Sequence, residues 1–162
     1  MIDIIADMLA SSSKELAVFV LAAMPVSELR GAIPMGIAFG IPPVKTFLVA
    51  FAGNMLPVIP LLFLFHPISE RLRKIPVFSR FFDWLENRTR KKSDLIERFE
   101  AIGLMLFVAV PLPMTGAWTG CIAATLFRIH FRYAFPAVTA GVAIAGIVIT
   151  LLSLAGKGLL GR

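Results

Sequence analysis

Four long apolar blocks, separated by short polar or charged stretches, dominate the pattern along the chain. They cover 16–43, 44–65, 101–127 and 134–155, and the first and third are interrupted near their middles. An apolar run of about 20 residues is long enough for a helix to cross a hydrocarbon core of roughly 30 Å. The pattern therefore predicts an all-α integral membrane protein.

The two interrupted blocks share one layout. Each has an apolar stretch, a proline, a short polar tip and a Gly-Ala dipeptide, and each is followed by a longer apolar helix. Proline and glycine interrupt helices, so each block is predicted to turn back as a re-entrant hairpin of two half-helices. The predicted breaks are Pro25, Gly31 and Pro34 in the first block, and Pro111, Pro113 and Gly116 in the second.

Two such hairpins, with one full crossing between them, would enter the membrane from opposite faces. This gives two inverted repeats, 16–66 and 101–156, each a re-entrant hairpin plus a transmembrane helix, within a single membrane domain, 1–162. The alternative is four complete crossings by kinked helices, and the distribution of Lys and Arg does not choose between the two. We favour hairpins because non-helical backbone at membrane depth occurs where it lines a cavity.

A basic segment, 67–100, joins the two repeats and carries more than half of the charged side chains. Its apolar residues recur at helical spacing, which predicts an amphipathic helix in the membrane interface with a basic flank toward anionic lipid headgroups. The alternative is a short linker helix that packs on its own protein. The apolar positions are Val77, Phe78, Phe81, Trp84 and Leu85.

Composition and charge narrow the class further. Apolar residues make up 58% of the chain and charged residues only 16%, against about 25% charged in an ordinary globular protein. This balance excludes an ordinary soluble enzyme domain. A net charge of +6 would suggest nucleic acid in a soluble protein. Here the charge lies beside apolar blocks, so we expect a multi-pass protein of the inner membrane with a cytoplasmic loop and no nucleic-acid partner.

Glu28 and Arg30 are the only charged residues in the interrupted part of the first block. A charge at the centre of a membrane helix costs roughly 2.5–3.5 kcal/mol, so such residues pair, face water or act. One hypothesis makes Glu28 a proton carrier or cation-binding carboxylate and Arg30 an anchor for an anionic group. The alternative is a structural ion pair. Ser27 is placed to cap the helix that follows.

The second tip carries no charge but offers hydrogen-bonding groups. These are the hydroxyls of Thr115 and Thr119, the indole of Trp118 and the N–H groups of a helix N-terminus, which suit an anion. Thr115 as a cap of its own helix is the alternative. Asn54, in the second block, is predicted either to line the same cavity or to bond a neighbouring helix.

Other motifs are missing from the sequence. There is no phosphate-binding loop, Cys121 is the only cysteine, and His66 and His130 lack metal-ligand spacing. We expect neither an enzyme nor a metal or cofactor site. Gly-x-x-x-Gly patterns after both tips are compatible with a homo-oligomer.

The run from Ala23 to Pro34 (AMPVSELRGAIP), with Gly53-Asn54 and the second tip from Pro111 to Gly120, resembles the small multidrug export protein family. The layout is also distantly similar to the DedA superfamily. That resemblance implies paired re-entrant hairpins, with Glu28 and Arg30 in the functional tip. Some DedA proteins move polyprenyl-phosphate lipids.

The sequence leads to one function hypothesis with two alternatives. We expect a small secondary transporter for protons and a lipophilic or anionic amphiphilic substrate, with Glu28, Arg30, Asn54, Thr115, Trp118 and Thr119 along its pathway. The alternatives are a polyprenyl-phosphate flippase of DedA type and a non-transporting structural or assembly protein. The expected partners are membrane lipids, the substrate and protons.

Overall fold

The computed structural model describes residues 2–64, 94–111 and 115–160. Every regular element in these ranges is a helix, which confirms the predicted all-α class. The predicted interfacial helix, with Phe78, Phe81, Trp84 and Leu85, lies outside the described residues, and so does the predicted break at Pro113.

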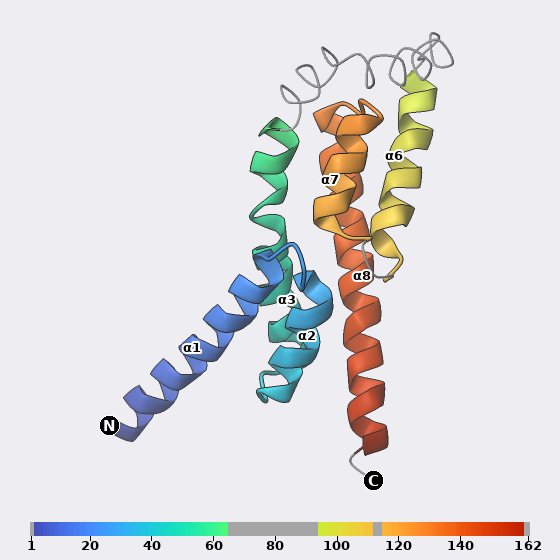
Figure 1. The fold of residues 1–162 in the computed structure, drawn as a ribbon. Coiled ribbons are helices and arrows are strands. Elements are labelled where there is room, and N and C mark those ends of the chain that lie inside the picture. Colours follow the sequence, from blue (N-terminus) through green and yellow to red (C-terminus); the bar gives the residue numbers. More distant parts are fainter. Residues whose placement is uncertain (1, 65–93, 112–114, 161–162) are drawn as a thin grey trace.

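Two helical hairpins form the middle of the molecule (Figure 1). In the first, α1 (Ile2–Ala23) turns into α2 (Glu28–Ala38). In the second, α6 (Asp94–Ala109) is followed by α7 (Ala117–Leu126). The first hairpin comes from the end that holds both chain termini and the second from the opposite end, and both turn near mid-height.

Two helix boundaries differ from the prediction. The sequence pattern predicted a helix from Leu16, but α1 begins at Ile2, because no proline or glycine precedes residue 16 to interrupt it. Likewise α6 begins at Asp94, so 94–100, assigned from sequence to the basic segment, belong to this helix.

A further helical segment follows each hairpin. After the first hairpin comes α3 (Pro43–Met55), then a turn at Leu56 and Pro57, and then a second helical stretch over 58–64. After the second hairpin comes α8 (Phe131–Leu160). Both are long and apolar enough to span a membrane, with 22 apolar-rich residues in the first and 28 in the second.

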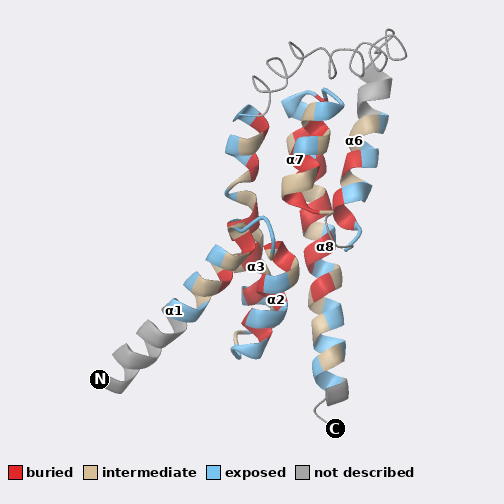
Figure 2. Cartoon of the chain, in the orientation of Figure 1, coloured by how far each residue is buried: buried red, intermediate tan, exposed pale blue. Residues whose placement is uncertain are grey.

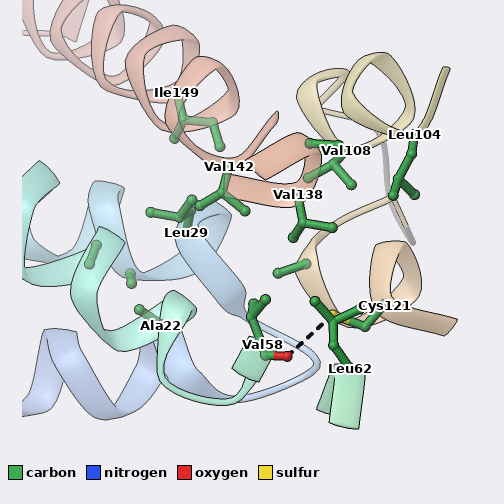
Figure 3. Close-up of a cluster of buried hydrophobic side chains, with 14 of the residues drawn as sticks. Ala22, Leu29, Val58, Leu62, Leu104, Val108, Cys121, Val138, Val142 and Ile149 are labelled. Atoms are coloured by element: carbon green, nitrogen blue, oxygen red, sulfur yellow. Dashed lines mark hydrogen bonds between the residues drawn. The ribbon is translucent and has the colours of Figure 1, made fainter. Parts of the chain in front are cut away.

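The helices pack in a similar way in the two halves of the molecule. The most extensive contacts join α1 to α3 and α6 to α8, so each hairpin packs on the long helix that follows it. The halves meet where α2 packs against α8. Between them lies a core of small and branched apolar side chains, including Leu29, Val58, Val108, Val138 and Val142 (Figure 3).

A few polar residues are buried with the apolar core, and many large apolar residues lie on the outer faces. Glu28, Thr46 and Asn54 are the buried polar or charged residues of the described chain. Large apolar side chains on the outer faces are exposed, such as Phe63 at 62% and Leu151 at 61% (Figure 2). Exposed apolar surface of this extent indicates a membrane environment, where lipid covers it.

Gly53 allows the closest approach between α1 and α3. A methyl group at this position would meet the backbone carbonyl of Phe19 and the side chain of Ala22. Backbone atoms cannot move aside as the end of a long side chain can, so α1 and α3 pack at this distance only with glycine here. The same contact fixes the position of the turn that leads to α2.

Candidate functional site

Glu28 begins α2 in an unusual conformation. Its φ is 45°, in the left-handed region, which costs a residue with a Cβ roughly 1–2 kcal/mol. Its side chain is nevertheless buried, with 8% exposed. Strained backbone at a buried acid is a common property of functional sites, where the surrounding structure holds the residue in place.

The Glu28 carboxylate lies at the N-terminus of α7, in the other hairpin. The backbone N–H of Trp118 donates to Glu28 Oε1 at 3.3 Å, and the N–H of Ala117 also faces the carboxylate. The first N–H groups of a helix have no partner within the helix, and the positive end of the helix dipole favours a negative charge. Glu28 therefore caps a helix that starts nearly 90 residues later in the chain.

Gly116 makes room for this contact. A Cβ at residue 116 would overlap the carboxylate of Glu28. The backbone of Gly116 is extended, with φ −165°, so glycine is required by lack of space and not by its torsion angles. The sequence predicts Gly116 as a hairpin break and as part of a Gly-x-x-x-Gly pattern, and the structure adds direct contact with the acid.

Arg30 reaches the second hairpin from two residues further along α2. Its guanidinium donates to the hydroxyl of Thr115 at 2.9 Å and to the carbonyl of Val110 at 3.5 Å. The Thr115 hydroxyl in turn donates to the Val110 carbonyl at 2.7 Å. Val110 follows the end of α6, where carbonyls lack helical partners, so Arg30 and Thr115 together satisfy that end.

Trp118 makes the reverse connection. Its indole Nε1 donates to the carbonyl of Ala23, the last residue of α1, at 3.2 Å. Arg30 of the first hairpin thus bonds a carbonyl at the end of α6, and Trp118 of the second hairpin bonds a carbonyl at the end of α1. Together with the Glu28 contact, these bonds join the two turns into one polar site.

Thr119, from the predicted pathway, and Ser27, a predicted helix cap, bond groups that are nearby in the chain. Thr119 accepts the N–H of Gly116 at 2.8 Å and so caps its own helix, a role that the sequence had suggested for Thr115. Ser27 was expected to cap α2, but its hydroxyl donates to the carbonyl of Leu21 at 2.5 Å, and no side-chain cap forms. Because the break is so short, the Ser27 hydroxyl reaches the end of the preceding helix.

A cavity adjoins the joined turns. Its polar and backbone walls come from Glu28, Arg30, Asn54, Gly116 and Ala117. Its apolar walls come from Leu29, Val108, Val142, Ala145 and Ile149. The empty volume is about 200 Å³, part of it open to the outside. Pockets for drug-sized ligands usually measure about 300–1,000 Å³, so this cavity is small in the present conformation.

Asn54 brings α3 into the site. It is 1% exposed, and its amide oxygen has no hydrogen-bond partner among the described residues. An unpaired buried polar atom costs about 1–3 kcal/mol. The structure places Asn54 on the cavity wall, one of the two positions that the sequence left open.

Sequence reasoning missed the contribution of α8. Val142, Ala145 and Ile149 line the cavity, but apolar residues in a long apolar helix carry no signal that separates them from lipid-facing neighbours. It also missed the carbonyls of Ala23 and Val110, since a backbone acceptor is present at every residue. Among the described residues, no three His, Cys, Asp or Glu side chains are grouped to hold a metal ion.

A family model described as "Putative small multi-drug export protein" matches residues 28–148, which include Glu28, Arg30 and the whole second hairpin turn. No curated protein and no solved structure matches the chain.

Proposed function

Because the chain belongs to the small multi-drug export protein family, we propose that it is a secondary transporter that exports or flips a lipophilic or anionic amphiphilic molecule in exchange for protons. The family and the two long apolar helices indicate a membrane location. The observation that carries the proposal is the meeting of a buried acid and an arginine between two helical turns, one from each end of the molecule.

In the proposed arrangement, α1–α2 and α6–α7 are re-entrant hairpins, and the long helices containing α3 and α8 cross the bilayer. α2 has 11 residues and α7 has 10, so each rises about 15 Å, half of a hydrocarbon core of roughly 30 Å. The matching contacts of α1 with α3 and of α6 with α8 support an inverted repeat.

The orientation follows from the basic segment. The described residues on either side of 65–93 lie at one end of the molecule, near the α7–α8 connection with Arg128, and both termini lie at the opposite end (Figure 1). Basic loops face the cytoplasm, so we propose a multi-pass inner-membrane protein whose C-terminus faces outward.

A reporter fused after Arg162 tests this orientation. We expect alkaline phosphatase to be active and green fluorescent protein to be dark at this position, because the first requires export and the second fails to fold after it. A fusion within 86–92, on the proposed cytoplasmic side, should give the opposite pattern and serves as the control. A cytoplasmic C-terminus would contradict the inverted repeat and support four full crossings.

Glu28 and Arg30 have different roles in the proposed mechanism. Glu28 is a carboxylate at the centre of the molecule, next to a cavity, and it can hold or release one proton. Arg30 can exchange its bonds with Thr115 and Val110 for bonds with an anionic headgroup, to which guanidinium binds strongly. The present conformation has the two turns joined, so passage of the substrate requires them to separate.

Flux measurements in liposomes test both roles. Purified protein is reconstituted with an imposed pH gradient, and the probes are ethidium, a lipophilic cation, and a fluorescent polyprenyl phosphate, an anionic lipid. We expect Glu28→Gln to reduce gradient-driven flux to that of protein-free liposomes, because glutamine has the same shape but cannot carry the proton. We expect Arg30→Ala to lower flux of the anionic probe by about 10–100-fold, the equivalent of one charge-assisted hydrogen bond of about 1.5–3 kcal/mol.

Glu15→Gln is the matched control. It also removes one carboxylate, but from an ion pair with Lys45 on the outer part of α1 and α3, where such pairs contribute little. Its flux should equal that of the wild type. Unchanged flux in both Glu28→Gln and Arg30→Ala would contradict the mechanism, and no flux of either probe in the wild type would favour the non-transporting alternative.

A further inference from the structure

The amide of Asn54 is a buried polar group of the site that takes no part in the contacts between the two turns. Its oxygen has no hydrogen-bond partner among the described residues, and only 1% of the residue is exposed. It lines the same cavity as Glu28. Buried polar atoms are nearly always paired, by protein groups or by ordered water.

The backbone near Asn54 adds a second polar feature. Pro57 has no N–H to offer the carbonyl of Gly53, four residues earlier, and the helix is interrupted at Leu56 and Pro57. Apolar helices usually satisfy all of their backbone groups, so a break beside an unpaired amide marks a place where polar groups face a cavity.

The size and charge of the cavity limit what it can hold. The cavity as a whole has room for about one water molecule, so a drug-sized molecule does not fit there. Glu28 and Arg30 already balance each other across the cavity wall, and the N-terminus of α7 adds further positive potential. An additional metal cation would therefore be repelled, whereas a neutral molecule that donates and accepts hydrogen bonds is accommodated.

We propose that this cavity binds one water molecule that bridges the Asn54 amide oxygen to the Glu28 carboxylate. The bridge suits both protonation states of the acid. Water donates one hydrogen to Asn54 and one to the ionised carboxylate, and it accepts the hydrogen of the protonated acid while still donating to Asn54. Asn54 is thus a positioning residue that acts through water on the group that we propose to carry the proton.

Among the described residues, two other titratable or charged groups interact with Glu28. Arg30 lies on the same wall, from α2, and the buried thiol of Cys121 belongs to α7. The Cys121 sulfur lies 3.9 Å from the carbonyl of Val58, in the part of α3 beyond the break (Figure 3). The α8 wall of the cavity carries no charged residue. The water bridge is therefore the link between α3 and the acid.

Infrared difference spectroscopy between high and low pH tests the bridge without any transport. In the wild type, we expect a carboxylic acid C=O band that disappears in Glu28→Gln, and an internal-water O–H band that shifts when the buffer contains H₂¹⁸O. In Asn54→Leu, which matches the size of asparagine, the water band should vanish and the C=O band should move to higher frequency, because the acid has lost a hydrogen bond.

Thr46→Val is the control for removing a buried polar group from α3. Thr46 is fully buried on the same helix, but it donates to the carbonyl of Ile41 at 3.3 Å and does not line the cavity. Both bands should keep their wild-type positions in this variant. Detergent melting temperatures show whether each variant is folded, and Asn54→Ala, which removes the amide without adding bulk, replaces Asn54→Leu if the latter is not.

The water bridge rests on the proposed proton-carrying role of Glu28, but different results would contradict the bridge and the transport mechanism. An H₂¹⁸O-insensitive spectrum in the wild type, or a water band retained in the folded Asn54 variant, overturns the water bridge even if transport depends on Glu28. A C=O band that shifts when Na⁺ is added at constant pH also overturns it and assigns the cavity to a metal cation. If the water band vanishes in Asn54→Leu as expected but flux is unchanged in Glu28→Gln, the bridge stands and only the transport mechanism is contradicted.

Discussion

Replacing Gly116 by alanine is expected to abolish gradient-driven flux and to lower the free energy of unfolding by about 1.5–3 kcal/mol, the range for a hydrogen bond to a charged group. The new methyl group would occupy the space of the Glu28 carboxylate, so the acid must leave the N-terminus of α7. The measurements are flux in liposomes and thermal unfolding in detergent.

Gly103→Ala on α6 is the matched control in the same hairpin. A Cβ at residue 103 meets nothing within 4 Å, and alanine favours helix by up to about 1 kcal/mol, so stability should be equal or higher and flux unchanged. The double variant Gly116→Ala with Glu28→Asp should regain part of the lost stability, because aspartate withdraws the carboxylate by one methylene. Wild-type flux in Gly116→Ala would contradict the contact between Glu28 and α7.

Replacing Gly53 by alanine is expected to cause the largest loss of stability among single methyl insertions between α1 and α3. The methyl group would meet the Phe19 carbonyl, and overpacking of this kind costs about 1–3 kcal/mol. Since α1 ends at the turn that leads to Glu28, the displacement should also reduce flux. Unfolding by heat in detergent and flux in liposomes measure the two effects.

Gly158→Ala near the end of α8 is the control, because a Cβ there meets nothing within 4 Å. It should unfold at the wild-type temperature or slightly higher. A Gly53→Ala protein as stable as Gly158→Ala would show that α1 and α3 are further apart than in the structure described above, and the close packing of the first hairpin on α3 would have to be abandoned.

Two of the helix breaks could be read from the sequence because their cause is local. The breaks predicted at Pro25 and Pro111 coincide with the turns after α1 and α6. The breaks predicted at Gly31 and Pro34 do not occur, because both residues lie inside α2. The apolar run of the fourth block likewise predicted α8, although the helix extends further at both ends. The helix end at Ala38 follows from the prolines at 42 and 43.

The partners of the site residues could be predicted only in part. The sequence placed Glu28 and Arg30 near the second tip, but it assigned helix caps by proximity along the chain. In the structure, the N-terminus of α7 is instead capped by Glu28, which comes from the other half of the molecule. A cap of this kind depends on the packing of α2 against α8 and α7 against α8, which no local pattern encodes. For the same reason, the need for glycine at residue 116 appears only once Glu28 is in place.

The hydrogen bonds between the two turns also set a thermal equilibrium. Neutral hydrogen bonds contribute about 1 kcal/mol net and charged ones about twice that, so the bonds from Trp118 to Glu28 and Ala23, and from Arg30 to Thr115, are worth on the order of 5 kcal/mol. If these bonds alone held the turns together, roughly one molecule in several thousand would have its turns apart at any moment. A molecule that binds only the separated turns must supply a similar free energy to populate that form. The strength of these few bonds thus determines how tightly a cargo must bind before the two halves of the protein part.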